Sequence, residues 1–114
     1  MKYLLLIHNT AAGDASLESH LGEPGDRDQA HARLCAELSA SGELLDTSAL
    51  EYDRTLVRGG ADGPRAVTDG PFTEAREIVG GYYLVDVASL DRAVEIAGRF
   101  VESRFAPVEI RALA

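Results

Sequence analysis

Two residues far apart in this chain have the side chains that a proton-transfer site needs. His31 stands in Gln29-Ala30-His31-Ala32-Arg33-Leu34, and Asp69 opens Asp69-Gly70-Pro71-Phe72. A carboxylate on one imidazole nitrogen fixes the tautomer and raises basicity, which leaves the other nitrogen to move a proton. His31 and Asp69 are therefore the candidate catalytic pair. The competing interpretations are a histidine satisfied by one packing hydrogen bond and an aspartate that bonds its own turn.

A second candidate site follows the Asp-Gly-Pro-Phe turn. Glu74 and Arg76 stand between this rigid turn and an apolar run that starts at Ile78, so their side chains can be directed into a cleft. Arg76 can hold a carboxylate ligand, or it can pair with a neighbouring glutamate. His8, at the end of the first apolar run, and Tyr83 complete the candidate ligand-binding set.

The histidines and the cysteine predict neither a metal site nor a disulfide. His8, His20 and His31 lack the short spacings of metal ligands, and the single Cys35 excludes an intrachain disulfide. Cys35 follows His31 by one helical turn and can contact it, but a lone buried cysteine is mostly packing. The glycine pairs do not precede helices, so no phosphate-bearing cofactor is expected.

The first half of the chain supplies a strand, a helix and a strand. Residues 3–7 are a continuous apolar run typical of a central strand, and residues 9–25 predict a long loop with at most one helical turn. A helix is expected from Asp26 or Asp28 to Ser41, with Gly42 as its terminator. Its 3.6-residue period places His31 at the edge of the buried face. A strand should follow at residues 43–50.

The second half predicts a hairpin, a strand, a helix and a strand. Residues 54–58 and 65–68 flank the turn cluster 59–64 and form the hairpin. Residues 78–87 form a strand in which Tyr82 and Tyr83 point to opposite faces. Ser89 caps the next helix, and residues 108–112 form the last strand. The expected apolar stripe of that helix consists of Leu90, Ala93, Val94, Ala97 and Val101.

Without its hairpin the element order is βαββαβ, which predicts an α+β, ferredoxin-like antiparallel sheet in a single domain, residues 1–114. Two helices cover one face of this sheet, and no element remains to cover the other. An open apolar sheet face normally marks an interaction surface. We therefore expect a homodimer that packs sheet against sheet.

Charge and hydropathy exclude several classes of partner. The net charge is −8, from 11 basic and 19 acidic residues. This charge argues against nucleic acid and against an anionic membrane surface, and it favours neutral or cationic small-molecule ligands. The apolar run at the N-terminus is too short for a signal peptide or a membrane span. A cytoplasmic location is the default expectation.

The run Asp69-Gly70-Pro71-Phe72-Thr73-Glu74-Ala75-Arg76-Glu77, followed by Gly80-Gly81-Tyr82-Tyr83, resembles the signature of the DGPF proteins, a branch of the YCII-related family. The resemblance covers nearly the whole chain and implies a ferredoxin-like fold and a dimeric α/β-barrel-like assembly. Other YCII-related proteins pair a histidine of the first helix with an aspartate near the end of the second. His31 looks like that histidine, but residues 100–106 hold no aspartate.

The resemblance implies two functions of different classes. Relatives with this fold include lactone isomerases and dehydrochlorinases, which implies an isomerase or lyase that acts on a small organic substrate. His31 would be the general base and Asp69 would orient it. The alternative is a noncatalytic ligand-binding or accessory protein, because DGPF proteins are commonly encoded beside extracytoplasmic-function sigma factors.

Overall fold

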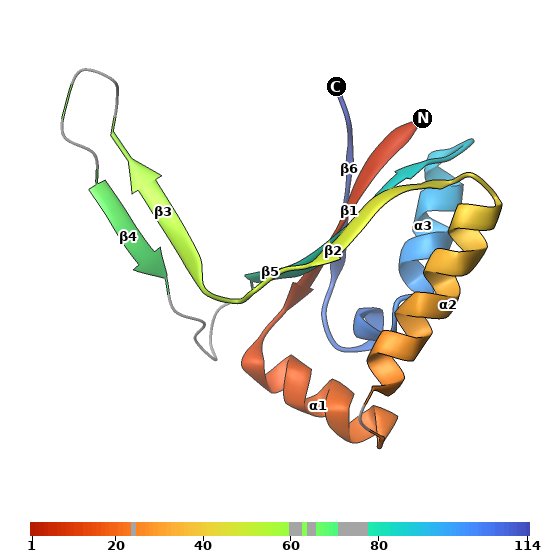
Figure 1. The fold of residues 1–114 in the computed structure, drawn as a ribbon, viewed down its shortest axis with the longest axis horizontal. Helices are drawn as coiled ribbons and strands as arrows, with labels where there is room; N and C mark the ends of the chain where they lie inside the picture. Colours follow the sequence, from red (N-terminus) through yellow and green to blue (C-terminus); the bar gives the residue numbers. More distant parts are fainter. Residues whose placement is uncertain (24, 60–62, 64–65, 71–77) are drawn as a thin grey trace.

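The computed structural model describes residues 1–23, 25–59, 63, 66–70 and 78–114, and it shows a mixed α+β fold (Figure 1). None of the helices in these residues is long and apolar enough to cross a membrane. The elements in chain order are β1 (Lys2–Asn9), α1 (Ala11–Leu21), α2 (Asp26–Ala40), β2 (Leu44–Ala49), β3 (Arg54–Arg58), β4 (Ala66–Gly70), β5 (Ile78–Asp86), α3 (Leu90–Gly98), the 3-10 helix η1 (Val101–Arg104) and β6 (Val108–Ala112).

The main sheet has four strands in the order β2-β5-β1-β6, and every neighbouring pair is antiparallel. This order is compatible with the expected ferredoxin-like arrangement. The expected hairpin is present as β3 and β4, which pair only with each other. It projects beyond the end of the sheet, away from α2 (Figure 1).

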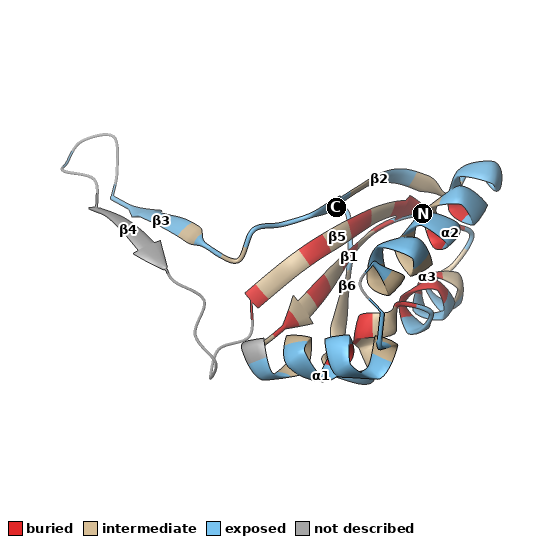
Figure 2. Cartoon of the chain, turned by 60° about the horizontal axis from the view of Figure 1, so that its bottom comes forward, coloured by how far each residue is buried: buried red, intermediate tan, exposed pale blue. Residues whose placement is uncertain are grey.

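The two central strands alternate between a buried and a partly exposed side. Tyr3, Leu5 and Ile7 of β1 are buried, as are Tyr83 and Val85 of β5. Because side chains alternate along a strand, these residues form one apolar face, and α2 and α3 cover it (Figure 2). The core of the protein lies between this face and the two helices.

A bulge in β5 interrupts the alternation near the end of β1. Ile7 pairs with Gly81 and His8 pairs with Val79, so Gly80 is an extra residue in β5. An extra residue reverses which side chains face inward beyond it. Gly81 is therefore buried on the helix side of the sheet, and so is Ile78, three residues earlier.

Helix α2 confirms the predicted helix and its buried face. Leu34 and Leu38 are buried against the sheet, and acidic residues in the first turn suit the positive end of the helix dipole. Helix α3 begins where Ser89 accepts a hydrogen bond from the backbone of Arg92, as expected. Its predicted stripe was partly wrong, because Leu90 and Val94 are 50% and 52% exposed. The buried face consists of Ala93, Ile96 and Ala97.

The predicted loop at residues 9–25 was wrong, because residues 11–21 form α1. The side chain of Thr10 caps this helix and accepts a hydrogen bond from the backbone of Gly13 at 3.0 Å. Leu17 is the only buried side chain that the structure describes in α1. A helix that buries so little apolar surface carries hardly any hydrophobic period, and this explains why the pattern indicated a loop.

No element in the described part of the chain covers the sheet face opposite the helices. Leu4 and Leu6 of β1 pair across the sheet with Leu84 and Tyr82 of β5, and all four are partly exposed. An apolar centre of this kind is typical of a surface that another protein covers. The sheet-to-sheet homodimer stays a prediction.

Candidate functional site

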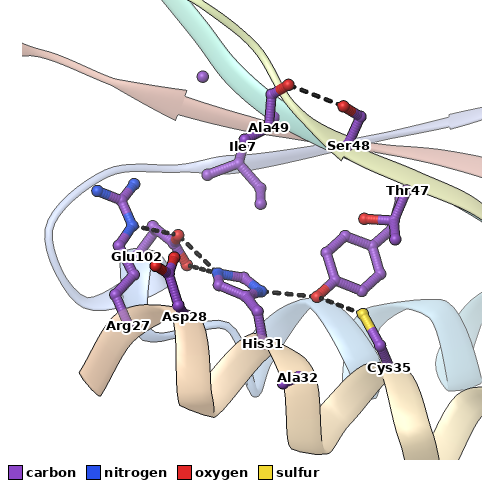
Figure 3. A pocket seen from close by; sticks show the side chains of 13 residues that line it. Ile7, Arg27, Asp28, His31, Ala32, Cys35, Thr47, Ser48, Ala49 and Glu102 are labelled. Atoms are coloured by element: carbon purple, nitrogen blue, oxygen red, sulfur yellow. Dashed lines mark hydrogen bonds and ion pairs between the residues drawn. The ribbon is translucent and has the colours of Figure 1, made fainter. Parts of the chain in front are cut away.

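A cavity of about 280 Å³ lies between α2 and the helix-facing side of the sheet (Figure 3). Its volume suits a small organic molecule rather than a polymer. The polar groups of the lining come from α2, β2, β5 and η1, and the rest of the lining is apolar or small. The residues that line it are Ile7, Arg27, Asp28, His31, Ala32, Cys35, Thr47, Ser48, Ala49, Gly80, Gly81, Tyr83 and Glu102.

His31 is held by a hydrogen bond at each ring nitrogen. Nε2 lies 2.7 Å from Oε2 of Glu102, and Nδ1 lies 2.6 Å from the hydroxyl of Tyr83. The side chain is 22% exposed, so the ring is held and yet lines the cavity. This position agrees with the prediction that His31 lies at the edge of the buried face of its helix.

Glu102 is a buried carboxylate that also bonds a cation. The residue is 3% exposed, and Nε of Arg27 donates to its Oε2 at 2.9 Å. Burial acts to raise the pKa of Glu102, but the hydrogen bond and charge of His31, together with Arg27, outweigh burial and hold that pKa below its usual value. Glu102 is therefore an ionised acceptor at neutral pH.

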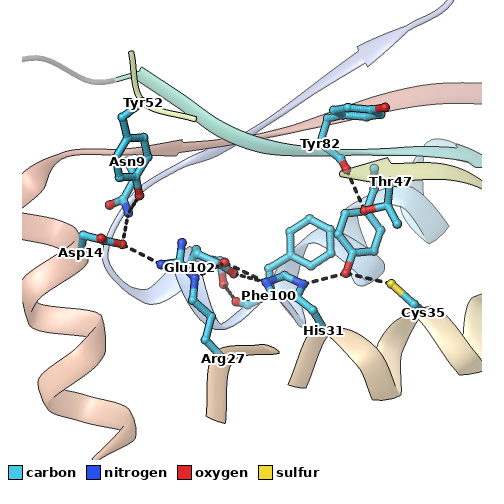
Figure 4. A network of polar contacts seen from close by, with 12 residues as sticks. Asn9, Asp14, Arg27, His31, Cys35, Thr47, Tyr52, Tyr82, Phe100 and Glu102 are labelled. Atoms are coloured by element: carbon cyan, nitrogen blue, oxygen red, sulfur yellow. Dashed lines mark hydrogen bonds and ion pairs between the residues drawn. The ribbon is translucent and has the colours of Figure 1, made fainter. Parts of the chain in front are cut away.

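The polar chain continues from Arg27 to the first helix and the first strand (Figure 4). Nη1 of Arg27 donates to Asp14 at 2.6 Å, and Asp14 accepts from Nδ2 of Asn9 at 2.8 Å. Asn9 is 2% exposed, and its Nδ2 also lies 3.2 Å from the hydroxyl of Tyr52. Helix α1 thus has a positional role, because it helps to fix the guanidinium that holds Glu102.

Tyr83 closes the other end of the polar chain. Its ring is buried and packs on Phe100, with centroids 4.5 Å apart. The thiol of Cys35 donates to its hydroxyl at 3.4 Å. Burial, followed by the interaction with Cys35, raises the pKa of Tyr83, against an opposite effect of Thr47. Tyr83 therefore keeps its proton at neutral pH.

The structure brings two of the predicted site residues together. His31 and Tyr83 share the cavity. His8 lies elsewhere, with its Nε2 2.7 Å from Oε1 of Glu109, which is 43% exposed. The backbone of Asp69 pairs with Thr55 in the projecting hairpin, and its side chain lies outside the described residues. The His31–Asp69 pair stays a prediction.

Glu74 and Arg76 also lie outside the residues that the structure describes, so their predicted role in ligand binding stays a prediction. Among the residues that it does describe, no cluster of histidine, cysteine or acidic side chains could hold a metal ion.

Sequence reasoning missed Glu102 and Arg27. The resemblance implied an aspartate near the end of the second helix, and residues 100–106 hold none. Glu102 stands in that region, in η1 just after α3, and its carboxylate reaches His31. Glu102 is the acidic residue within 100–106, and this was the signal that could have identified it. Arg27 has a weaker signal, since an arginine in the first turn of an otherwise acidic helix start is unusual.

Comparison with known proteins identifies the family. A family model of the YCII-related domain matches residues 1–111. An uncharacterized protein of Rhizobium meliloti (strain 1021) is 51% identical over 35 residues, which are 31% of this chain and 28% of that protein. The matched segment thus spans less than a third of that relative. The match to the family model covers almost the entire chain, and the protein belongs to the YCII-related family.

Proposed function

We propose that this protein is a small acid–base enzyme that moves protons on a small, uncharged organic molecule. The observation that carries the proposal is the 2.7 Å contact between Nε2 of His31 and the buried carboxylate of Glu102, at the wall of the cavity. A histidine held in this way is the usual proton carrier of isomerases and lyases. Glu102 takes the orienting role that the sequence suggested for Asp69.

The chemistry follows from the charge on Glu102. An ionised carboxylate only accepts, so Nε2 of His31 carries a proton and Nδ1 of the neutral ring is the basic nitrogen. When Nδ1 takes up a proton, the ring becomes a cation 2.7 Å from a buried anion. The positive charge that the ring gains is thus paired with the negative charge of Glu102. Release of the proton restores the resting state.

Deuterium exchange tests this function without knowledge of the natural substrate. A panel of small, uncharged ketones and lactones is incubated with the protein in heavy water, and loss of the protons next to the carbonyl is followed by proton NMR. We expect His31→Gln and Glu102→Gln to slow exchange by roughly 10²- to 10⁴-fold. His20→Gln is the matched control, because His20 packs on Phe105, away from the cavity.

Equal exchange by wild type and His31→Gln would refute the proposal. Binding of a panel member by the wild type without any exchange would favour the noncatalytic alternative, a ligand-binding or accessory protein. The two results separate because binding is measured by amide shifts and turnover is measured by isotope content.

We further propose that the protein works as a homodimer that packs through the open sheet face. This assembly is supported by four partly exposed residues that form an apolar centre, which no described element covers: Leu4, Leu6, Tyr82 and Leu84. The two cavities would then open on the outer, helix-bearing sides of the assembly. A sedimentation experiment at micromolar concentration tests it.

A further inference from the structure

The hydrogen-bond chain through His31 has a direction. Glu102 accepts from Nε2, so the neutral ring has its lone pair at Nδ1, and the hydroxyl of Tyr83 must donate to that nitrogen at 2.6 Å. The thiol of Cys35 then donates to the oxygen of Tyr83 at 3.4 Å. The order of donation is Cys35 to Tyr83 to His31 on one side and His31 to Glu102 on the other.

This direction leaves neither nitrogen of His31 free for a ligand. Nε2 is bonded to a carboxylate that is 3% exposed, and Nδ1 is bonded to Tyr83. The oxygen of Tyr83 accepts a weaker hydrogen bond, because its contact with Cys35 is long and a thiol is a weak donor. A ligand oxygen in the cavity can replace that weak thiol donor, and Thr47, which also lines the cavity, interacts with the same hydroxyl.

We infer that Tyr83 is the catalytic residue that contacts the ligand, where it relays a proton between His31 and the oxygen of a small, uncharged enol or enolisable carbonyl compound. This inference rests on the proposed proton-transfer function. In the relay the O–H bond of the enol breaks and its proton bonds to the oxygen of Tyr83. The original Tyr83 O–H bond breaks at the same time, and that proton bonds to Nδ1 of His31.

The relay balances in charge. The ligand becomes an enolate with one negative charge, and the imidazolium of His31 carries one positive charge beside Glu102. In the reverse direction the imidazolium returns a proton through Tyr83 to the enolate oxygen. Tyr83 remains a neutral phenol before and after each transfer, which agrees with its burial.

The charges around the cavity select an uncharged ligand. Glu102 and Asp28 both line it, whereas the guanidinium of Arg27 is already bonded to Glu102 and to Asp14. An anionic ligand would meet carboxylates without a spare cation among the described lining residues. The remaining wall, which includes Ile7, is largely apolar and suits a hydrocarbon ring.

Three probes of similar size test the inference. 2-Tetralone is an enolisable ketone, 2-naphthol mimics its enol, and 2-naphthoate is an anion on the same ring. Binding is followed by the amide NMR shifts of cavity residues such as Ile7 and Gly81. We expect 2-naphthol to bind the wild type and to bind Tyr83→Phe about tenfold more weakly, the loss of one hydrogen bond. 2-Naphthoate should not bind at the same concentration.

Tyr82→Phe is the matched control, because Tyr82 lies on the opposite face of β5 and its hydroxyl bonds Asp46 at 2.7 Å. This control should bind 2-naphthol as the wild type does. If Tyr83→Phe does not fold, the inference is tested on the wild type alone. Saturation with 2-naphthol should then shift the Nδ1 resonance of His31 more than its Nε2 resonance.

The outcomes separate the relay from the function on which it rests. Equal binding of 2-naphthol by wild type and Tyr83→Phe, an unchanged Nδ1 resonance, or tighter binding of 2-naphthoate would overturn the inference. Deuterium exchange of 2-tetralone that survives in Tyr83→Phe but fails in His31→Gln would refute the relay and keep the function. Tyr83-dependent binding of 2-naphthol without any exchange would keep the contact and refute the function.

Discussion

Nε2 of His31 and Oε2 of Glu102 lie 2.7 Å apart, although the two residues are 71 positions apart in the chain. Helix α2 supplies the imidazole and η1 supplies the carboxylate. Arg27, one turn before His31 on α2, bonds the same carboxylate oxygen. Tertiary packing therefore brings the two side chains together, and their hydrogen bond should depend on the positions of both α2 and η1.

Removal of the Glu102 charge should destabilise the protein. Glu102→Gln removes the buried anion that His31 and Arg27 both bond, so we expect a loss of about 1–3 kcal/mol in the free energy of unfolding. Glu109→Gln is the matched control, since Glu109 bonds His8 at the same 2.7 Å but is 43% exposed. Its loss should stay below about 1 kcal/mol. Equal losses in urea titrations would contradict the buried pair.

The stabilisation of the folded protein by Glu102 should decrease as the pH falls. The pKa of Glu102 is lower in the folded protein than its ordinary value of about 4.3. A depressed carboxyl pKa means that the stabilisation is present above the unfolded pKa and is lost as the pH falls through the folded pKa. The groups that face Glu102 are His31 and Arg27 of α2 and, beyond them, Tyr83 of β5.

The measurement is the difference in unfolding free energy between wild type and Glu102→Gln at several pH values. We expect this difference to shrink steadily as the pH falls below about 4.3, because the wild type then loses the same charge. A difference that grows in acid would show that the folded protein raises the pKa of Glu102 instead.

The tautomer of His31 should identify its carboxylate partner. With Glu102 as acceptor, ring-nitrogen NMR of the wild type should show a neutral ring protonated at Nε2. Glu102→Gln should shift this ring toward a mixture of tautomers. Asp69→Asn should leave it unchanged, since both ring nitrogens already have partners. A tautomer change in Asp69→Asn alone would restore the pair that the sequence suggested.

Phe100 should be the apolar support of the site. It is 2% exposed, and its ring lies 4.5 Å from Tyr83 and 5.8 Å from His31 by centroid distance. Phe100→Ala should cost about 3–5 kcal/mol in thermal or urea unfolding. Phe105→Ala is the control, because Phe105 also packs on a histidine but is 37% exposed. A cost for Phe105→Ala as large as that for Phe100→Ala would argue against this role.

A charge on the open sheet face should dissociate the proposed homodimer. Leu6→Arg places a cation beside Tyr82 at the centre of that face, and sedimentation should then report the 12.2 kDa chain instead of twice that mass. Val94→Arg introduces the same charge on the exposed side of α3 and should leave the mass unchanged. A wild-type protein that sediments as a monomer at micromolar concentration would refute the assembly.

The fold was largely accessible from sequence because its main elements bury continuous apolar faces. Strand β1 and helix α2 are examples, with Leu5 and Leu38 at 0% exposure. Helix α1 was not predicted because Leu17 is the only buried side chain among its described residues. His31 was predicted because the helical period gives its place on α2. Glu102 was not predicted, because its contact with His31 depends on how η1 packs against α2, and no local period encodes that contact.

The bulge at Gly80 leaves a glycine, Gly81, on the wall of the cavity. A methyl group at this position would lie 3.2 Å from the carbonyl oxygen of Ser48 and 3.7 Å from Cδ1 of Ile7, two other residues of the wall. The cavity therefore owes part of its width to an absent side chain on β5, whereas the two residues of the proposed proton relay are His31 on α2 and Tyr83, two positions further along β5. If the proposed function holds, ligand size and proton transfer depend on different positions, so a substitution at position 81 would change which ligands fit without any change to His31 or Glu102.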